Sequence, residues 1–195
     1  MLKFEGYDWN LWLWWIVANS AGGFLGLIVF LGLSFILGAS LPGATDGEVM
    51  SIGAQLTAAP IFGVAGLILG VMQWFVLRMI GESYLSWIIA TGTGWLVGYM
   101  LAVLLFALAP SQSNTFMGPL ILFLAIGLSI GVAQWYILRT RYSATDWWIL
   151  ATTIATIIGW AGLLVGGFCG TGLTWATAGA ITGYVLLRIT QPRLD

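Results

Sequence analysis

Histidine is absent from this 195-residue chain, and cysteine occurs once, as Cys169. The absence of histidine excludes a His-ligated haem, a His-held chlorophyll and a His-based metal site. A single cysteine forms neither an internal disulfide nor the usual thiolate metal site. The serines have no histidine to activate them, and no carboxylate or lysine stands at a spacing that would replace one. The sequence therefore predicts a protein that is not an enzyme and holds no metal.

Charge is also scarce. Asp, Glu, Lys and Arg make up 7% of the residues, against about a quarter in an average soluble domain. Apolar residues make up 60%, and the charge-free stretches 83–138 and 147–187 are each too long for one membrane span. A turn at 168–172 is expected to divide the second of them. We predict an all-α integral membrane protein with six transmembrane helices, at about 11–38, 56–78, 85–109, 117–139, 147–168 and 172–190.

The six basic residues lie on one side of this predicted bundle. They stand before the first helix or after the second, fourth or sixth (Lys3, Arg78, Arg139, Arg141, Arg188 and Arg193). By the positive-inside rule this side is cytoplasmic, so both termini are expected there. Residues 39–55 then form the main loop on the opposite side. Six basic and seven acidic residues form no polybasic cluster, so we expect the lipid bilayer as a partner and no nucleic acid.

A nine-residue phrase recurs along the chain. Residues 70–78 (GVMQWFVLR) return as 131–139 (GVAQWYILR), and a weaker copy occupies 180–188 (AITGYVLLR). A tryptophan opens the segment that precedes each copy (Trp15, Trp87 and Trp148). Such recurrence indicates one supersecondary unit used several times. We predict a single membrane domain, 1–195, made of three helical hairpins at about 9–80, 81–141 and 142–190.

Small residues four positions apart recur at equivalent places in these hairpins. The glycines among them are Gly22, Gly26, Gly66, Gly70, Gly94, Gly98, Gly127, Gly131 and Gly159. Lipid tails give helices no hydrophobic reason to associate, so membrane helices commonly pack through small residues that let backbones approach. We expect these glycines to mark contacts between helices of one molecule. Contacts between two copies are the alternative.

Polar residues within the spans fall at one depth. Asn19, Thr91 and Thr152 each lie about one turn past an opening tryptophan, and Gln73 and Gln134 each lie five residues before an arginine. At 1.5 Å per residue, both sets lie at a similar shallow depth in the cytoplasmic leaflet. A polar group without a partner costs several kcal/mol in hydrocarbon, so these side chains are expected to pair.

The simplest pairing joins residues of one hairpin (Asn19 with Gln73, and Thr91 with Gln134). In the third hairpin Thr152 lies opposite Gly183, so its pair is expected to be missing or to be replaced through Thr182. The alternative is a layer that faces a cavity or pore and contacts a ligand.

Nine of the twelve tryptophans lie near the predicted cytoplasmic boundary (Trp9, Trp12, Trp14, Trp15, Trp74, Trp87, Trp135, Trp147 and Trp148). An aromatic belt at the level of the lipid headgroups accounts for them. Trp95, Trp160 and Trp175 lie deeper. They are candidates for core packing or for contact with a bound molecule.

The clearest repeat runs from Gly131 to Arg139 and continues through 147–152 to Gly159 and Trp160. It resembles a group of bacterial multi-pass membrane proteins of unknown activity, in which a Gly-x-x-Gln-Trp-x-x-Leu-Arg phrase precedes Trp-x-x-Ala-Thr-x-x-Gly-Trp. The resemblance implies a location in the bacterial inner (plasma) membrane or the thylakoid membrane. It implies no activity.

No ionisable residue falls within the hydrocarbon part of any proposed helix, which disfavours ion-coupled transporters, proton relays and voltage sensors. The leading hypothesis is a non-catalytic accessory or scaffold protein. It would be a subunit of a larger membrane complex, such as a photosynthetic assembly, with other subunits or a second copy as partners. The alternative is a binding or permeation module for a neutral lipid, a carotenoid or other pigment, a quinone or a small solute. A sensor or signalling domain is the third hypothesis.

Overall fold

The computed structural model describes residues 3–4, 7–40, 52–81, 85–108, 117–142 and 145–190. Nearly all of them are helical, as expected. The helices are α1 (Trp9–Ser40), α2 (Ile52–Met79), α3 (Leu85–Leu108), α4 (Met117–Leu138) and α5 (Trp147–Thr190). Two-residue strands, β1 (Lys3–Phe4) and β2 (Tyr7–Asp8), form an antiparallel pair before α1. The predicted loop residues 41–51 and 110–114, including Asp46 and Glu48, lie outside the described residues.

Four helices are long and apolar enough to cross a membrane: the segments Trp9–Ile36, Gln55–Met79, Leu85–Leu108 and Met117–Leu138. A helix satisfies its own backbone hydrogen bonds, which is what a spanning segment needs in lipid. Large apolar side chains face outward along these helices, among them Phe35 (80% exposed) and Leu108 (84% exposed). These features indicate an integral membrane protein.

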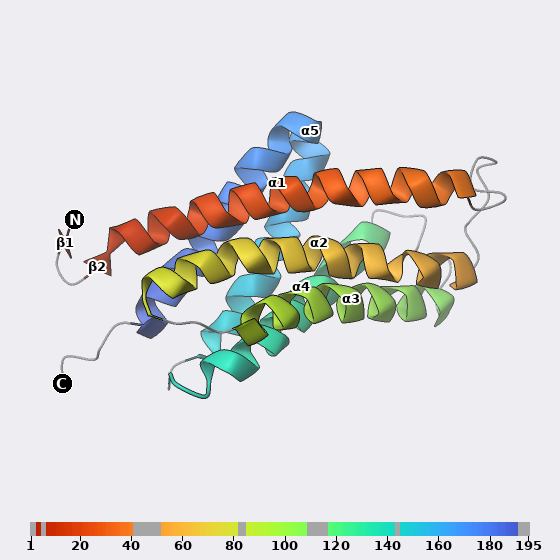
Figure 1. Cartoon of the computed structure of the whole chain (residues 1–195). Helices are drawn as coiled ribbons and strands as arrows, with labels where there is room; N and C mark the ends of the chain where they lie inside the picture. The colour runs from red at the N-terminus through yellow and green to blue at the C-terminus, as the bar shows by residue number, and fades with distance from the viewer. Residues whose placement is uncertain are drawn as a thin grey trace.

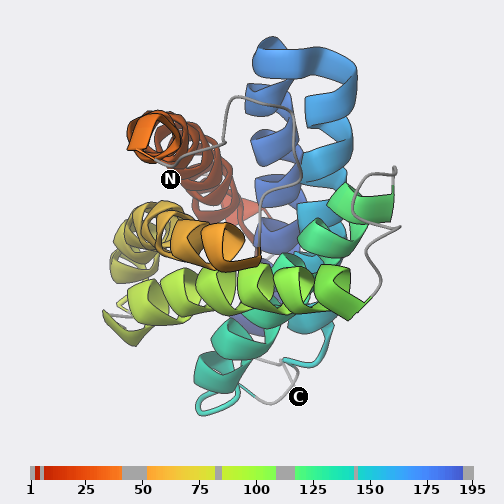
Figure 2. The same cartoon turned by 90° about the vertical axis from the view of Figure 1, so that its right-hand side faces the viewer.

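The fifth helix differs from its prediction. We expected two helices divided by a turn at 168–172, but the backbone is helical from Trp147 to Thr190. The ribbon of α5 nevertheless turns over near its middle and returns beside itself (Figure 2). Gly162 lies against the side chain of Thr174, whereas a straight helix would separate these residues by about 18 Å. The segment from Gly162 to Gly172 is rich in glycine, a residue at which helices bend sharply.

The contacts between the helices close a ring, and Figure 1 shows α1, α2 and α3 lying alongside one another. Each helix packs against the next along the chain, and α5 packs against both α4 and α1. Gly127 and Gly131 of α4 contact the first half of α5, at Thr153 and Ile149. The second half contacts α1, where Gly179 lies against Asn19. Because α5 doubles back, its end lies at the same end of the bundle as the beginning of α1.

Glycines lie where the helices approach most closely. A Cβ atom at Gly94 would stand 2.6 Å from the Cα of Ile130, and one at Gly127 would stand 2.9 Å from the Cα of Thr153. Gly22, Gly26, Gly70, Gly98 and Gly131 likewise face the backbone of a neighbouring helix. Gly66 instead faces the side chain of Trp95. A Cβ at Gly159 would meet nothing within 4 Å, so that residue marks no contact in the described structure.

Candidate functional site

Three buried tryptophans meet at one end of the bundle. Trp15, Trp87 and Trp148 are 0%, 0% and 1% exposed. Their ring centroids lie 6.1 Å (Trp15 to Trp87), 6.1 Å (Trp15 to Trp148) and 5.7 Å (Trp87 to Trp148) apart, in edge-to-face arrangements. Edge-to-face packing brings the positive edge of one ring to the negative face of another. We call these residues the tryptophan triad.

The triad corrects the aromatic-belt prediction for these three residues. The position of a tryptophan in the sequence gives its depth along the helix, but the side of the helix that faces inward depends on how the helices pack. Trp147 shows the difference, because it is 69% exposed while its neighbour Trp148 is buried. Trp9 and Trp14 are also exposed, which is compatible with a belt.

A layer of neutral polar side chains lies against the triad. Gln73 Nε2 donates to Asn19 Oδ1 at 3.0 Å, and Gln134 Nε2 donates to Thr91 Oγ1 at 2.9 Å. Both expected pairs are therefore hydrogen bonded. Gln134 Nε2 also approaches Gln73 Oε1 at 3.2 Å, a link between hairpins that we did not expect.

The triad completes this network. Trp87 Nε1 donates to Gln73 Oε1 at 2.9 Å, and Trp148 Nε1 donates to Gln134 Oε1 at 3.1 Å. Each of these pairs spans 14 residues of sequence. Sequence reasoning missed this role, although the equal spacing in two repeats was a usable signal.

The third hairpin closes the ring with a different residue. Trp15 Nε1 donates to Thr182 Oγ1 at 3.0 Å, and the Thr182 hydroxyl donates to the carbonyl of Ala178 at 2.9 Å. Glycine at position 183 has no side chain to take the place of a glutamine, so Thr182 takes that place. Thr152 is buried, and its hydroxyl has no partner among the described residues.

The layer holds its shape but offers no acid or base. Asn19 Nδ2 and the hydroxyl of Thr91 also donate to backbone carbonyls one turn earlier in their own helices, at 2.8 Å each. Every member of the network is an amide, a hydroxyl or an indole. No cluster of His, Cys, Asp and Glu suited to a metal ion occurs in the described part of the chain. The arrangement can hold the helices together and fill the interior of the bundle at the triad end.

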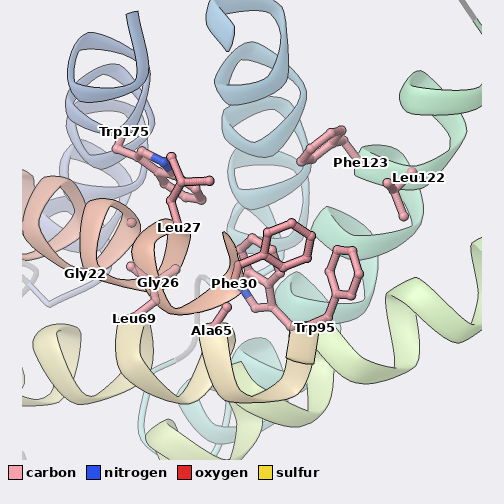
Figure 3. Close-up of a pocket in the computed structure, with 12 residues that line it drawn as sticks. Gly22, Gly26, Leu27, Phe30, Ala65, Leu69, Trp95, Leu122, Phe123 and Trp175 are labelled. Carbon is pink, nitrogen blue, oxygen red and sulfur yellow. The ribbon is translucent and has the colours of Figure 1, made fainter. Parts of the chain in front are cut away.

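An apolar pocket of about 210 Å³ lies on the other side of the layer. All five helices contribute to its lining, which includes Phe30, Phe62, Leu69, Trp95, Phe123 and Trp175 (Figure 3). Trp95 and Trp175 stack at 6.1 Å between ring centroids with 30° between planes. Two of the three deeper tryptophans thus line a pocket, and the side chain of Trp160 lies outside the described residues.

A smaller pocket of about 30 Å³ separates the apolar pocket from the layer. Leu69, Trp95 and Trp175 line both pockets. Gln73, Gln134 and Thr152 also line the small pocket, which makes it polar and roomy enough for a water molecule. The order along the axis is therefore triad, polar layer, small polar pocket and apolar pocket.

Three aromatic–arginine pairs occupy equivalent positions in the repeats. The guanidinium of Arg78 lies 5.1 Å from the ring centroid of Trp74, and that of Arg139 lies 4.5 Å from Trp135. Arg188 lies 5.4 Å from the ring of Tyr184 and donates to its hydroxyl. The leucines just before these arginines (Leu77, Leu138 and Leu187) pack in the same cluster as the triad. The basic residues therefore mark the triad end of the bundle.

Comparison with protein-family models, with curated proteins and with solved structures finds no match.

Proposed function

We propose that this chain is a six-span membrane protein that binds a small neutral molecule in its apolar pocket. The observation that carries the proposal is the pocket itself, about 210 Å³ in volume and lined by all five helices. Side chains as large as Phe30, Phe62 and Phe123 surround it without filling it. Close packing is the rule in protein interiors, so a pocket of this size that all five helices line favours binding over the accessory role.

The volume limits the ligand. An apolar cavity of about 150 Å³ is large enough for benzene, so about 210 Å³ suits a single ring with a short substituent. A carotenoid or a lipid could enter only with part of its length. Small ring compounds, including the headgroup of a quinone, fit best among the neutral molecules expected from the sequence.

The closed end of the bundle supports binding rather than permeation. A molecule crossing along the axis would have to displace Trp15, Trp87 and Trp148, which are fully buried and hydrogen bonded. It would also have to break the Gln73–Asn19 and Gln134–Thr91 bonds. A pocket closed at one end is suited to holding a molecule that enters from the membrane or from the opposite end.

The proposed topology places the triad end at the cytoplasm. Arg78, Arg139 and Arg188 lie at that end, and the positive-inside rule assigns such an end to the cytoplasmic face. If each half of α5 crosses the membrane, the proposed number of spans is six, and both termini would lie on that side. The resemblance of the repeats to bacterial multi-pass proteins supports the inner (plasma) membrane or the thylakoid membrane as the location.

Binding can be tested with isopropenylbenzene, an uncharged single-ring probe. Protein in lipid nanodiscs would be equilibrated with the probe, and its uptake would be measured by headspace gas chromatography. We expect saturable uptake by the wild type and its loss in Leu122→Trp, which adds volume inside the pocket. Leu104→Trp is the control, because Leu104 is 53% exposed and is not among the residues that line the pocket.

Equal uptake by all three proteins at the same lipid content would contradict the proposal. If a stoichiometric protein partner then co-purified from native membranes, the accessory-subunit hypothesis would replace it.

A further inference from the structure

One of the rings that line the apolar pocket carries a buried donor. Trp95 is 8% exposed, and its indole N–H has no hydrogen-bond partner among the described residues. The buried tryptophans of the triad each donate to a side chain, and Trp12 donates to the carbonyl of Ala180 at 3.0 Å. Trp74 Nε1 is also buried without a partner among the described residues, but Trp74 does not line the pocket. A buried donor without a partner is unfavourable, so Trp95 calls for a partner at the pocket.

The two pocket indoles are seated against glycines. A Cβ at Gly66 of α2 would lie 2.6 Å from Cδ1 of Trp95, and one at Gly23 of α1 would overlap the ring of Trp175. Any larger residue at either position would push the ring away. The glycines thus allow the two rings to stack beside the pocket.

The lining of the pocket includes two indoles and no side-chain acceptor. The twelve residues that line it are glycine, alanine, leucine, phenylalanine and tryptophan. A ligand hydroxyl or amine would therefore leave its own hydrogen unpaired, and a buried carboxylate would lack a cation. A neutral carbonyl oxygen matches this lining, because it accepts a hydrogen bond and brings no hydrogen of its own.

We infer that the ligand is a neutral single-ring compound with a carbonyl group, held by a hydrogen bond from Trp95 Nε1. This inference rests on the proposed function and narrows its substrate class. The ring of the ligand packs among the aromatic and leucine side chains of the pocket. The carbonyl oxygen lies at the end of the pocket formed by Leu69, Trp95 and Trp175.

Acetophenone and isopropenylbenzene test the inference, because they have the same shape and differ by an oxygen in place of a CH₂ group. Their uptake by wild-type nanodiscs would be compared with uptake by Trp95→Phe, which keeps a ring and removes the N–H. One net hydrogen bond corresponds to about a fivefold change in affinity. We expect the ratio of acetophenone to isopropenylbenzene affinity to fall by about that factor in Trp95→Phe, and to stay unchanged in Trp175→Phe. The partitioning of each probe into the nanodisc lipid is the same for every variant, so it cancels when the affinity ratios of the variants are compared.

A second measurement uses the wild type alone, in case Trp95→Phe does not fold. In protein labelled with ¹⁵N-tryptophan, acetophenone should shift one indole N–H signal downfield, and isopropenylbenzene should leave that proton unshifted. An unchanged affinity ratio, or no acetophenone-specific shift, would overturn the inference and assign the N–H to the small polar pocket. Such a result would leave the proposed function standing if both probes bind. If the wild type bound neither acetophenone nor isopropenylbenzene, the proposed function itself would be refuted.

Discussion

At the scale of single residues, Gln73 connects more of the polar layer than any pairwise scheme suggests. It donates to Asn19 and accepts from both Trp87 and Gln134. Its side chain is 5% exposed, so each of these partners depends on it rather than on solvent. The sequence predicted the bond to Asn19 from depth alone. It could not predict the other two, because depth places a residue along the axis and leaves its direction around the axis open.

Replacing Gln73 with leucine should therefore cost more than one average membrane hydrogen bond, which is worth about 0.6 kcal/mol. The change leaves the N–H of Trp87 and the amide oxygen of Asn19 without partners in a buried site. We expect the free energy of unfolding to fall by about 1–3 kcal/mol, as measured by reversible unfolding in mixed detergent micelles.

Thr152→Val is the matched control, because the Thr152 hydroxyl is buried without a partner. That change should be neutral or slightly stabilising. A Thr152→Val protein as unstable as Gln73→Leu would show that the hydroxyl has a partner that matters and that the network extends into the small pocket.

At the scale of helices, the glycines selected by their spacing lie against a neighbouring helix at every position except Gly159. At Gly22, Gly94 and Gly127 the backbone of a neighbouring helix comes close, because a residue without a side chain leaves room for it. Gly159 shares the spacing and is buried, but a Cβ there would meet no atom of the described residues within 4 Å. The four-residue spacing of small residues indicates which face of a helix is narrow. A contact also requires a neighbouring helix at the same level along the bundle.

Alanine substitutions separate these two kinds of glycine. In a helix, Gly→Ala is favourable by roughly 0.5–1 kcal/mol when the new methyl group has room. Gly32→Ala and Gly159→Ala should therefore be neutral or stabilising, since neither Cβ would meet an atom within 4 Å. Gly94→Ala should be destabilising, because its methyl group would collide with the backbone of Ile130.

The same unfolding assay measures all three variants. Equal stability of Gly94→Ala and Gly32→Ala would mean that α3 and α4 do not approach through Gly94.

At the scale of the whole molecule, the sequence predicted a helical protein with membrane-spanning segments, but not the pocket. Helix positions follow from long apolar runs and the breaks between them. A pocket depends on how large and small side chains combine, here Phe30 with Gly22 and Gly26 on α1 and Phe123 on α4. The triad depends on the closure of the ring between α5 and α1, which brings Trp15 beside Trp148. Contacts between segments that are distant in the sequence cannot be predicted from the pattern of apolar and small residues along a single helix.

The proposed topology is testable. It places the end of α4 on the cytoplasmic side and the start of α2 on the opposite side. We would replace Cys169 with alanine and introduce Ile52→Cys or Thr140→Cys, both at exposed positions. A membrane-impermeant maleimide added to intact cells should label Ile52→Cys, and it should label Thr140→Cys only after permeabilisation. Labelling of both from the same side would contradict the topology, and with it the assignment of the triad end to the cytoplasm.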